Sequence, residues 1–278
     1  GVTHRGINPK RLFFQDASLD RIRLMECFSA PAGSDQPAVF EPIERLTAMA
    51  AGRGEGVAAD DYYALGVTLL ALIKGQDLAQ GRDAAQVMAA KIAHGSFWAL
   101  TGGAELAGGL NTLLRGLLQD EPKQRWGADE LADWLGGATR TAATPADSWS
   151  LARQVIYGGG SFSDRRALAQ ALAADSGEAA AYIKKLDLEH WLSLHLPQAP
   201  TTSEFFRLIL HGQGGRRGDM ALSGPDHLVA RFCAMLDPMG PIRFRRLVVM
   251  PDGLGPALAD GLNQGPGSPA AEDLAELI

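Results

Sequence analysis

The sequence has few cysteines, no long apolar run and little net charge, and each absence excludes a class of protein. Its only two cysteines, Cys27 and Cys233, lie far apart, so we expect no disulfide framework and a reducing, cytoplasmic location. The longest dense apolar stretch, residues 65–73, is far shorter than the ~20 residues of a transmembrane helix. The N-terminal residues lack a charged segment followed by an apolar one, so no signal peptide is predicted.

The charge and the histidines exclude further functions. A formal net charge of −6 at pH 7 argues against nucleic-acid binding. The histidines and cysteines show no metal-ligand spacing, so we predict no metal and no other cofactor. With 278 residues, of which 46% are hydrophobic, the chain can form one large or two small domains with a sizeable core.

Hydrophobic periodicity predicts a mainly α protein in two parts. The first part, residues 1–137, opens with two short apolar strands, LFF and IRLM, around a polar turn, which predicts a hairpin. Residues 138–147 are small and polar with one proline and predict a linker. Helical periodicity in the first part falls at residues 60–74, 83–94, 106–118 and 128–135.

The second part, residues 148–262, is predicted to be a mainly helical domain of unknown type. Residues 263–278 are predicted to form a flexible tail or a short helix, and residues 242–250 a strand pair or an edge strand. The helix at 164–174 is expected to take Ser163 as its cap. Helices are expected at 164–174, 177–186, 188–196, 202–211 and 225–236.

Three stretches of the second part raise the question of a binding function. Residues 166–192 could be a DNA-reading helix-turn-helix, but five basic and five acidic residues lie between Leu151 and Pro200, which favours a small bundle with Trp191 and Leu192 in its core. GGGSF, residues 158–162, lacks the Lys-Ser/Thr of a phosphate-binding loop, which favours a turn before a helix. RFRRL, residues 243–247, is either a solvated strand face or a site for an acidic partner.

The motif at the start of the chain carries the functional argument. HRGINPKR, residues 4–11, is followed in order by IRLMECF, VFEPIER, DDYYALGVTLLALIKG and LLQDEPKQRW. In order and spacing these segments resemble the catalytic loop, the strand leading to DFG, the APE segment, the helix with a buried Asp and the late DPxxR segment of eukaryotic-like Ser/Thr protein kinases of bacteria. The resemblance covers residues 1–137 and implies the C-terminal lobe of that fold, helical with short β-hairpins.

The resemblance also implies that the chemistry is lost. Gly6 stands where the family has its proton-accepting Asp, Asn8 where it has Lys, and Arg11 where it has the metal-binding Asn. Phosphoryl transfer depends on positioning and charge neutralisation, so these losses together predict no catalysis. The degenerate loop thus keeps His4 and Arg5 and has replacements at Gly6, Asn8 and Arg11, while Glu26, Cys27 and Phe28 occupy the DFG slot.

The framework positions are retained. By the resemblance, Asp61 would bond the backbone of the HRG turn and Glu44 would pair with Arg125. A lobe that keeps its framework and loses its catalytic groups implies a pseudokinase that acts as a scaffold or regulator for a protein partner. Two alternatives stay open: a phosphotransferase of altered mechanism that uses Glu26 with an upstream nucleotide-binding lobe, and a structural subunit of a larger assembly.

Overall fold

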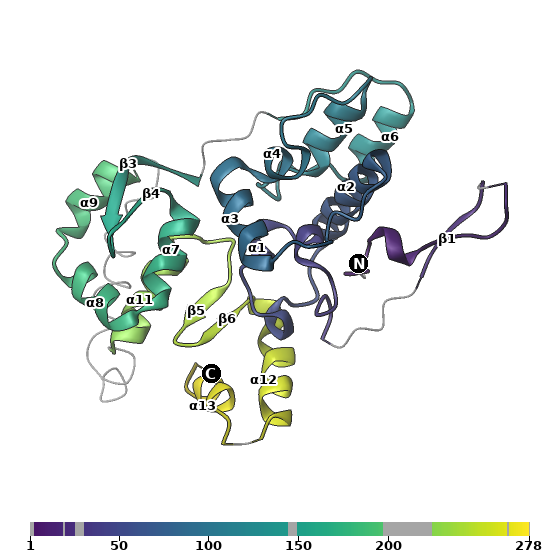
Figure 1. Ribbon diagram of the computed structural model, residues 1–278. Helices are drawn as coiled ribbons and strands as arrows, with labels where there is room; N and C mark the ends of the chain where they lie inside the picture. The colour runs from purple at the N-terminus through teal and green to yellow at the C-terminus, as the bar shows by residue number, and fades with distance from the viewer. Residues whose placement is uncertain are drawn as a thin grey trace. The chain divides into compact units, whose positions relative to one another are not determined.

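The computed structural model describes residues 3–18, 20–25, 31–143, 149–196, 224–265 and 267–277, and these are mainly helical with short antiparallel strand pairs (Figure 1). The chain forms two compact units. The first contains Gly1–Ala146 and Met250–Ala257, and the second contains Asp147–Val249 and Leu258–Ile278. The division falls inside the segment predicted as a linker, whereas nothing in the sequence predicted that Met250–Ala257 belongs to the first unit.

The first unit contains the predicted hairpin and all the predicted helices, although the helix expected at 106–118 begins only at Leu110, after Gly108 with a left-handed φ of 61°. The short helices α1 and α4 were not predicted. Its elements are β1 (Leu12–Phe14), β2 (Ile22–Leu24), α1 (Ile43–Leu46), α2 (Ala58–Lys74), α3 (Ala84–His94), α4 (Ser96–Thr101), α5 (Leu110–Leu117) and α6 (Ala128–Leu135), with 3-10 turns η1 (Pro9–Arg11), η2 (Ala38–Phe40), η3 (Ala50–Gly52) and η6 (Pro251–Gly253).

Helix α2 is the centre of the first unit. Tyr63, Val67 and Leu70 recur at helical spacing, are fully buried, and each stabilises the fold by ~1.5–3 kcal/mol. Gly66 permits close contact with α5, because a Cβ there would lie 2.8 Å from the Cβ of Leu117. The neighbouring elements of the first unit pack against the core that forms around α2.

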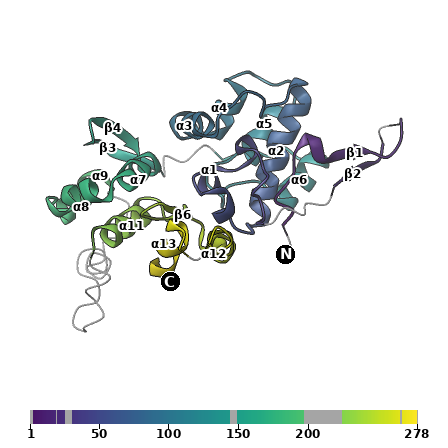
Figure 2. The ribbon, with the colours of Figure 1, turned by 60° about the horizontal axis from the view of Figure 1, so that its bottom comes forward.

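The second unit pairs a hairpin with a helical bundle in which α11 packs against α7 and α8 (Figure 2). Trp191 and Leu192 are buried in its core, which confirms that part of the bundle prediction. The helix predicted at 202–211 lies outside the described residues. Its elements are β3 (Ser150–Tyr157), β4 (Gly160–Asp164), α7 (Arg165–Ala174), α8 (Ser176–Lys184), α9 (Leu188–His195), α11 (Pro225–Leu236), β5 (Ile242–Phe244), β6 (Leu247–Val249) and α13 (Pro269–Leu277), while α12 (Leu254–Asn263) begins in the first unit and ends in the second.

Two expectations for this unit are wrong. GGGSF is not a turn before a helix: Gly158 and Gly159, with φ of 53° and 76°, form the turn between β3 and β4. The sequence hid β3 because the strand register shifts between Ser150 and Val155 and disrupts the alternation of apolar residues. Asp164, not Ser163, caps α7, since its carboxylate accepts hydrogen bonds from the backbone N–H groups of Arg166 and Ala167, the second and third residues of that helix.

Candidate functional site: the HRGINPKR loop

The start of α2 holds the backbone of the HRG turn. The carboxylate of Asp61 accepts hydrogen bonds from the backbone N–H groups of His4, at 2.7 Å, and Arg5, at 2.9 Å. Hydrogen bonds to an ionised acceptor are among the strong ones. They fix Arg5 at a φ of 56°, a left-handed conformation that a non-glycine residue adopts only when its surroundings impose it. The contact that the resemblance implied is present, although Asp61 is only half-buried.

The side chain of Arg5 is enclosed within the fold. Its Nη2 donates to both carboxylate oxygens of Glu41, at 3.2 and 2.9 Å, and both residues are buried. Burial raises the pKa of Glu41, and the neighbouring guanidinium of Arg5 opposes that effect. Gly33 and Gly56 make room, since a Cβ on either would lie within 3 Å of the Arg5 side chain. Arg5 is therefore a structural cation and is not exposed to a ligand.

The polar group of Asn8 is used within the loop itself. Its Nδ2 donates to the carbonyl of Gly6 at 3.3 Å and to Oε1 of Gln36 at 3.1 Å, and its Oδ1 accepts from the N–H of Lys10. Gln36 in turn donates to the carbonyl of Ile7 at 3.0 Å. The Gln36 amide thus fixes the segment at residues 31–37 to the loop. Nothing in the sequence pointed to Gln36, because its partners lie far from it along the chain.

The remaining positions of the loop carry less information. Gly6 has no side chain and lies in buried backbone. Arg11 ends the turn η1, its N–H donates to the carbonyl of Asn8, and its carbonyl accepts from Met25. His4 contacts the carbonyl of Met25 through Nε2 at 2.6 Å, as a loop histidine packed against its surroundings would. The residues of the DFG slot, Glu26, Cys27 and Phe28, lie outside the described residues.

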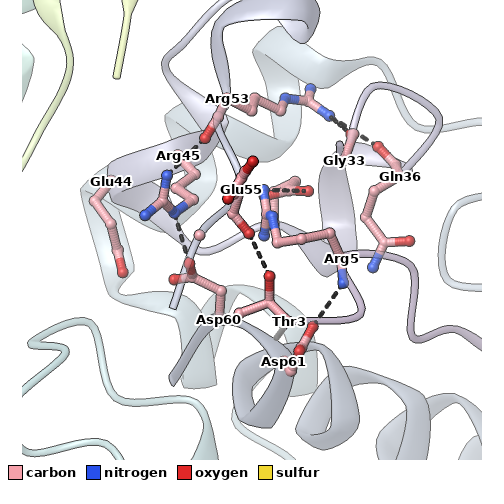
Figure 3. A network of polar contacts seen from close by, with 12 residues as sticks. Thr3, Arg5, Gly33, Gln36, Glu44, Arg45, Arg53, Glu55, Asp60 and Asp61 are labelled. Carbon is pink, nitrogen blue, oxygen red and sulfur yellow. Dashed lines mark hydrogen bonds and ion pairs between the residues drawn. The ribbon is translucent and has the colours of Figure 1, made fainter. Parts of the chain in front are cut away.

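A buried network of alternating charges lies at the start of α2, next to Asp61. Arg125 donates to Glu44 at 2.9 Å, which is the pair that the resemblance implied, and its Nη1 lies 3.7 Å from Asp60. Asp60 also accepts from Nε of Arg45 at 2.6 Å (Figure 3). Burial raises the pKa of Glu44 and Arg125 opposes that effect. Each charge of the network has at least one partner of opposite sign, so none is uncompensated.

The network continues into the segment that returns from the C-terminal part of the chain. Asp252, in η6, accepts from Nη1 of Arg45 at 3.0 Å and from the N–H of Gly56 at 2.9 Å. The N–H of Met250 donates to the carbonyl of Gly52. Since Gly52 and Gly56 flank the loop before α2, the returning segment fixes the stretch of chain that leads into the helix carrying Asp61.

A buried lysine fixes the segment on the other side of the loop. The ammonium group of Lys91, on α3, donates to the carbonyls of Ala38, Val39 and Glu41, at 3.4, 3.0 and 2.7 Å, and lies 4.9 Å from the ring centre of Tyr63. Burial lowers the pKa of Lys91 to about 7. Its contacts are to backbone and core, so Lys91 positions this segment and does not face a substrate.

An apolar groove opens beside the loop. We define the loop groove as a hollow of about 260 Å³ whose lining includes Pro9, Pro37, Phe40, Ala71 and Leu72. Leu72, near the end of α2, is 54% exposed and presents its side chain to the groove and to solvent. An ion pair between Lys10 and Asp77, at 2.9 Å, lies among the lining residues. The groove is therefore apolar in its walls and charged at one point.

The adjoining hairpin is exposed as well. On β1 and β2, Phe13, Phe14 and Ile22 are each about half exposed, although they belong to the most apolar stretch of the loop region. Strand edges with exposed large apolar residues are unfavourable in water and are normally covered by another surface. Among the described residues of the first unit, the hairpin and the loop groove both present exposed apolar side chains.

Other candidate residues do not form a site. Within the described residues, no group of three or more His, Cys, Asp or Glu side chains could hold a metal ion. Cys233 is buried, and burial raises the pKa of its thiol to about 12, so it is inert at neutral pH. No helix in the described parts of the chain is long and apolar enough to cross a membrane.

The chain was compared with protein-family models, curated proteins and solved structures, and it matches none of them.

Proposed function

We propose that the chain is a catalytically inactive, protein-kinase-like module that acts as a scaffold or regulator for a protein partner. The observation that carries the proposal is the use of Asn8, which stands where the kinase family has a catalytic lysine. Every polar atom of its side chain is hydrogen-bonded to the loop or to Gln36. With Gly6 beside it, the loop offers no free group to accept a proton or to steady a phosphate at these positions.

The framework contacts support the kinase-like part of the proposal. The bonds from Asp61 to the HRG turn and the pair between Glu44 and Arg125 are the contacts that this family uses to shape its lobe. These contacts keep the shape of the loop, and Gln36 occupies the amide of Asn8. Together they favour a binding role for this surface over a catalytic one. Glu26, on which the alternative of a phosphotransferase depends, lies outside the described residues, so that alternative stays open.

The loop groove is the surface that we assign to the partner. Its apolar walls and its volume of about 260 Å³ suit one or two apolar side chains of a peptide segment. Burial of an exposed leucine such as Leu72 contributes ~1.5–3 kcal/mol to binding before the entropy cost of association. The exposed hairpin beside it extends the area that a partner can cover.

Site-specific photo-crosslinking in cells tests this assignment. A photoreactive amino acid at Leu72, in the loop groove, is expected to give discrete adducts with one or a few proteins. The matched control carries it at Leu135, which is 77% exposed on α6 and does not line the groove. Adducts at both positions, or at neither, would contradict a partner site in the loop groove.

A further inference from the structure

The basic stretch at residues 243–247 binds an acidic helix of its own chain. Arg245 donates to Glu276 at 2.8 Å, and Arg246 donates to Asp273 at 2.7 Å, both on α13. The stretch is therefore neither a solvated strand face nor a vacant site for an acidic partner. An exposed arginine of the first unit, Arg115 on α5, differs from these two, because no ion pair of the described residues includes it.

Arg115 belongs to the lining of a second hollow in the first unit. This hollow measures about 310 Å³ and is lined by the end of α3, by α4, by α5 and by residues that follow α5. It shares none of its described lining residues with the loop groove. We call it the aromatic pocket, because the rings of His94, Phe97 and Trp98 are part of its wall. Its volume and its mixture of rings with a few polar groups are typical of a site for a small molecule.

The largest ring of the aromatic pocket is exposed and held in place. Trp98 is 53% exposed, and its ring centre lies 5.1 Å from that of His94. Gly103, with a φ of 75°, lets the chain pass close to the indole, since a Cβ there would lie 3.2 Å from Nε1 of Trp98. The indole therefore offers a flat apolar surface against which a planar ring can stack.

A buried amide fixes the backbone of another wall. Gln119 is 4% exposed, and its Nε2 donates to the carbonyl of Ala143 at 2.6 Å. Its own carbonyl accepts from Nε of Arg125 at 2.9 Å. Ala142 and Ala143 line the pocket and are held there by this contact. A ligand that enters a pocket with fixed walls loses little free energy to the ordering of the protein.

The charge that the aromatic pocket presents to a ligand is positive. Its charged residues are Arg115 and Asp120. Asp120 is engaged inside the unit: its Oδ2 accepts from the N–H of Ser96 at 2.9 Å, and its Oδ1 is buried without a hydrogen-bond partner among the described residues. The guanidinium of Arg115 lies 4.2 Å from the ring centre of Phe97. Stacking on a ring orients a guanidinium and leaves the N–H donors in its plane available to a carboxylate.

We propose that the aromatic pocket binds a small organic acid that carries a planar ring. The ring stacks on Trp98, and the carboxylate accepts hydrogen bonds from the guanidinium of Arg115. The choice of an anion rests on charge complementarity, since Arg115 is exposed and unpaired whereas Asp120 is bonded to Ser96. The choice of a planar ring rests on the exposed indole. The proposal does not depend on the function proposed for the loop or on the loop groove.

Titration of the full chain with three naphthalene derivatives tests the proposal, because naphthoate, naphthylmethylamine and naphthylmethanol share one ring and differ in charge. Two-dimensional NMR follows the indole N–H signal of Trp98, assigned with Trp98→Phe. The signal of Trp134, which does not line the pocket, is the internal control. Naphthoate is expected to shift the Trp98 signal saturably and to bind at least ~10-fold more tightly than the other two.

The same titrations can overturn the proposal without any variant that has to fold. Equal binding of the three compounds, or tighter binding of the amine, would contradict an anion site at Arg115. A Trp98 signal that none of the three compounds shifts would contradict a ligand site in the aromatic pocket.

Substitution of Arg115 tests the residue that selects the anion. Arg115→Gln is expected to weaken naphthoate binding ~10-fold and to leave naphthylmethanol binding unchanged. Arg115→Lys should restore part of the loss, because it keeps the charge but not the planar fork of donors. The matched control is Arg140→Gln, which removes a 42% exposed arginine outside the pocket and should leave naphthoate binding unchanged. Equal losses in Arg115→Gln and Arg140→Gln would overturn the assignment of Arg115.

Discussion

At the scale of single residues, the first unit depends on buried charges that compensate one another. Arg125, Glu44, Asp60 and Arg45 are all less than 9% exposed and form one alternating chain of ion pairs. Transfer of a charge from water into a protein interior is costly, and only a well-placed partner offsets that cost. Removal of one member therefore leaves its buried partner with too little opposite charge beside it.

We expect Glu44→Gln to destabilise the protein by about 3–5 kcal/mol, because it leaves Arg125 short of a counter-charge. The matched control is Lys10→Met, which removes one member of an ion pair that is 75% and 35% exposed and should change stability by less than about 1 kcal/mol. Urea unfolding of both variants measures the difference. Equal effects of the two substitutions would show that the buried network does not stabilise the first unit.

Lys91 should make stability depend on pH. Burial lowers its pKa to about 7 in the folded protein, from 10.5 in the unfolded chain. Between these values the unfolded chain binds more protons at this residue, so the free energy of unfolding rises with pH. Relative to a Lys91→Met variant, the unaltered protein should gain stability from pH 7 to pH 9 in urea unfolding. A difference that stays constant over this range would mean that Lys91 remains charged when folded.

At the scale of elements, a helix or strand could be predicted from the sequence where apolar residues recur at a regular spacing over several turns or residues. Helix α2 was predictable because its apolar residues recur over several turns and Gly75 ends it in a left-handed conformation. The hairpin of β3 and β4 was missed because a shift of register breaks its alternation. The positions of Gln36 and Asp252 could not be predicted, since both act on residues far away along the chain and neither has a local signature.

A substitution in the 3-10 turn η6 tests how much the returning segment, Met250–Ala257, contributes to the stability of the first unit. A Cβ at Gly253 would lie 2.2 Å from the carbonyl oxygen of Gly52, so Gly253→Ala should destabilise the protein by ~1–3 kcal/mol. Gly255→Ala, two residues on, meets nothing within 4 Å and replaces a helical glycine, so it should be neutral or stabilise by up to about 1 kcal/mol. Thermal unfolding compares the two. A stable Gly253→Ala variant would show that η6 does not pack closely against η3.

At the scale of the whole molecule, each of the two units is built from two separate stretches of the sequence. Met250–Ala257 completes the first unit, and Leu258–Ile278 completes the second. In the first unit Asp61 bonds the backbone of the HRG turn and Glu44 pairs with Arg125, while the amide of Asn8 is bonded to the loop and to Gln36, and these contacts support the kinase-like module that we propose. A fold of this kind does not fix a function, so the proposed role depends on the chemistry of the loop and on the surfaces beside it.

The most direct test of this account is the thermal unfolding of the full chain with ATP and Mg²⁺ together, compared with each alone. A ligand that binds only the folded state raises the unfolding temperature in proportion to its occupancy. The account predicts no Mg²⁺-dependent rise, because in the kinase-like loop that we propose Asn8 replaces the group that would steady a phosphate and Arg11 replaces the group that would hold a metal. A saturable, Mg²⁺-dependent rise with ATP would contradict it.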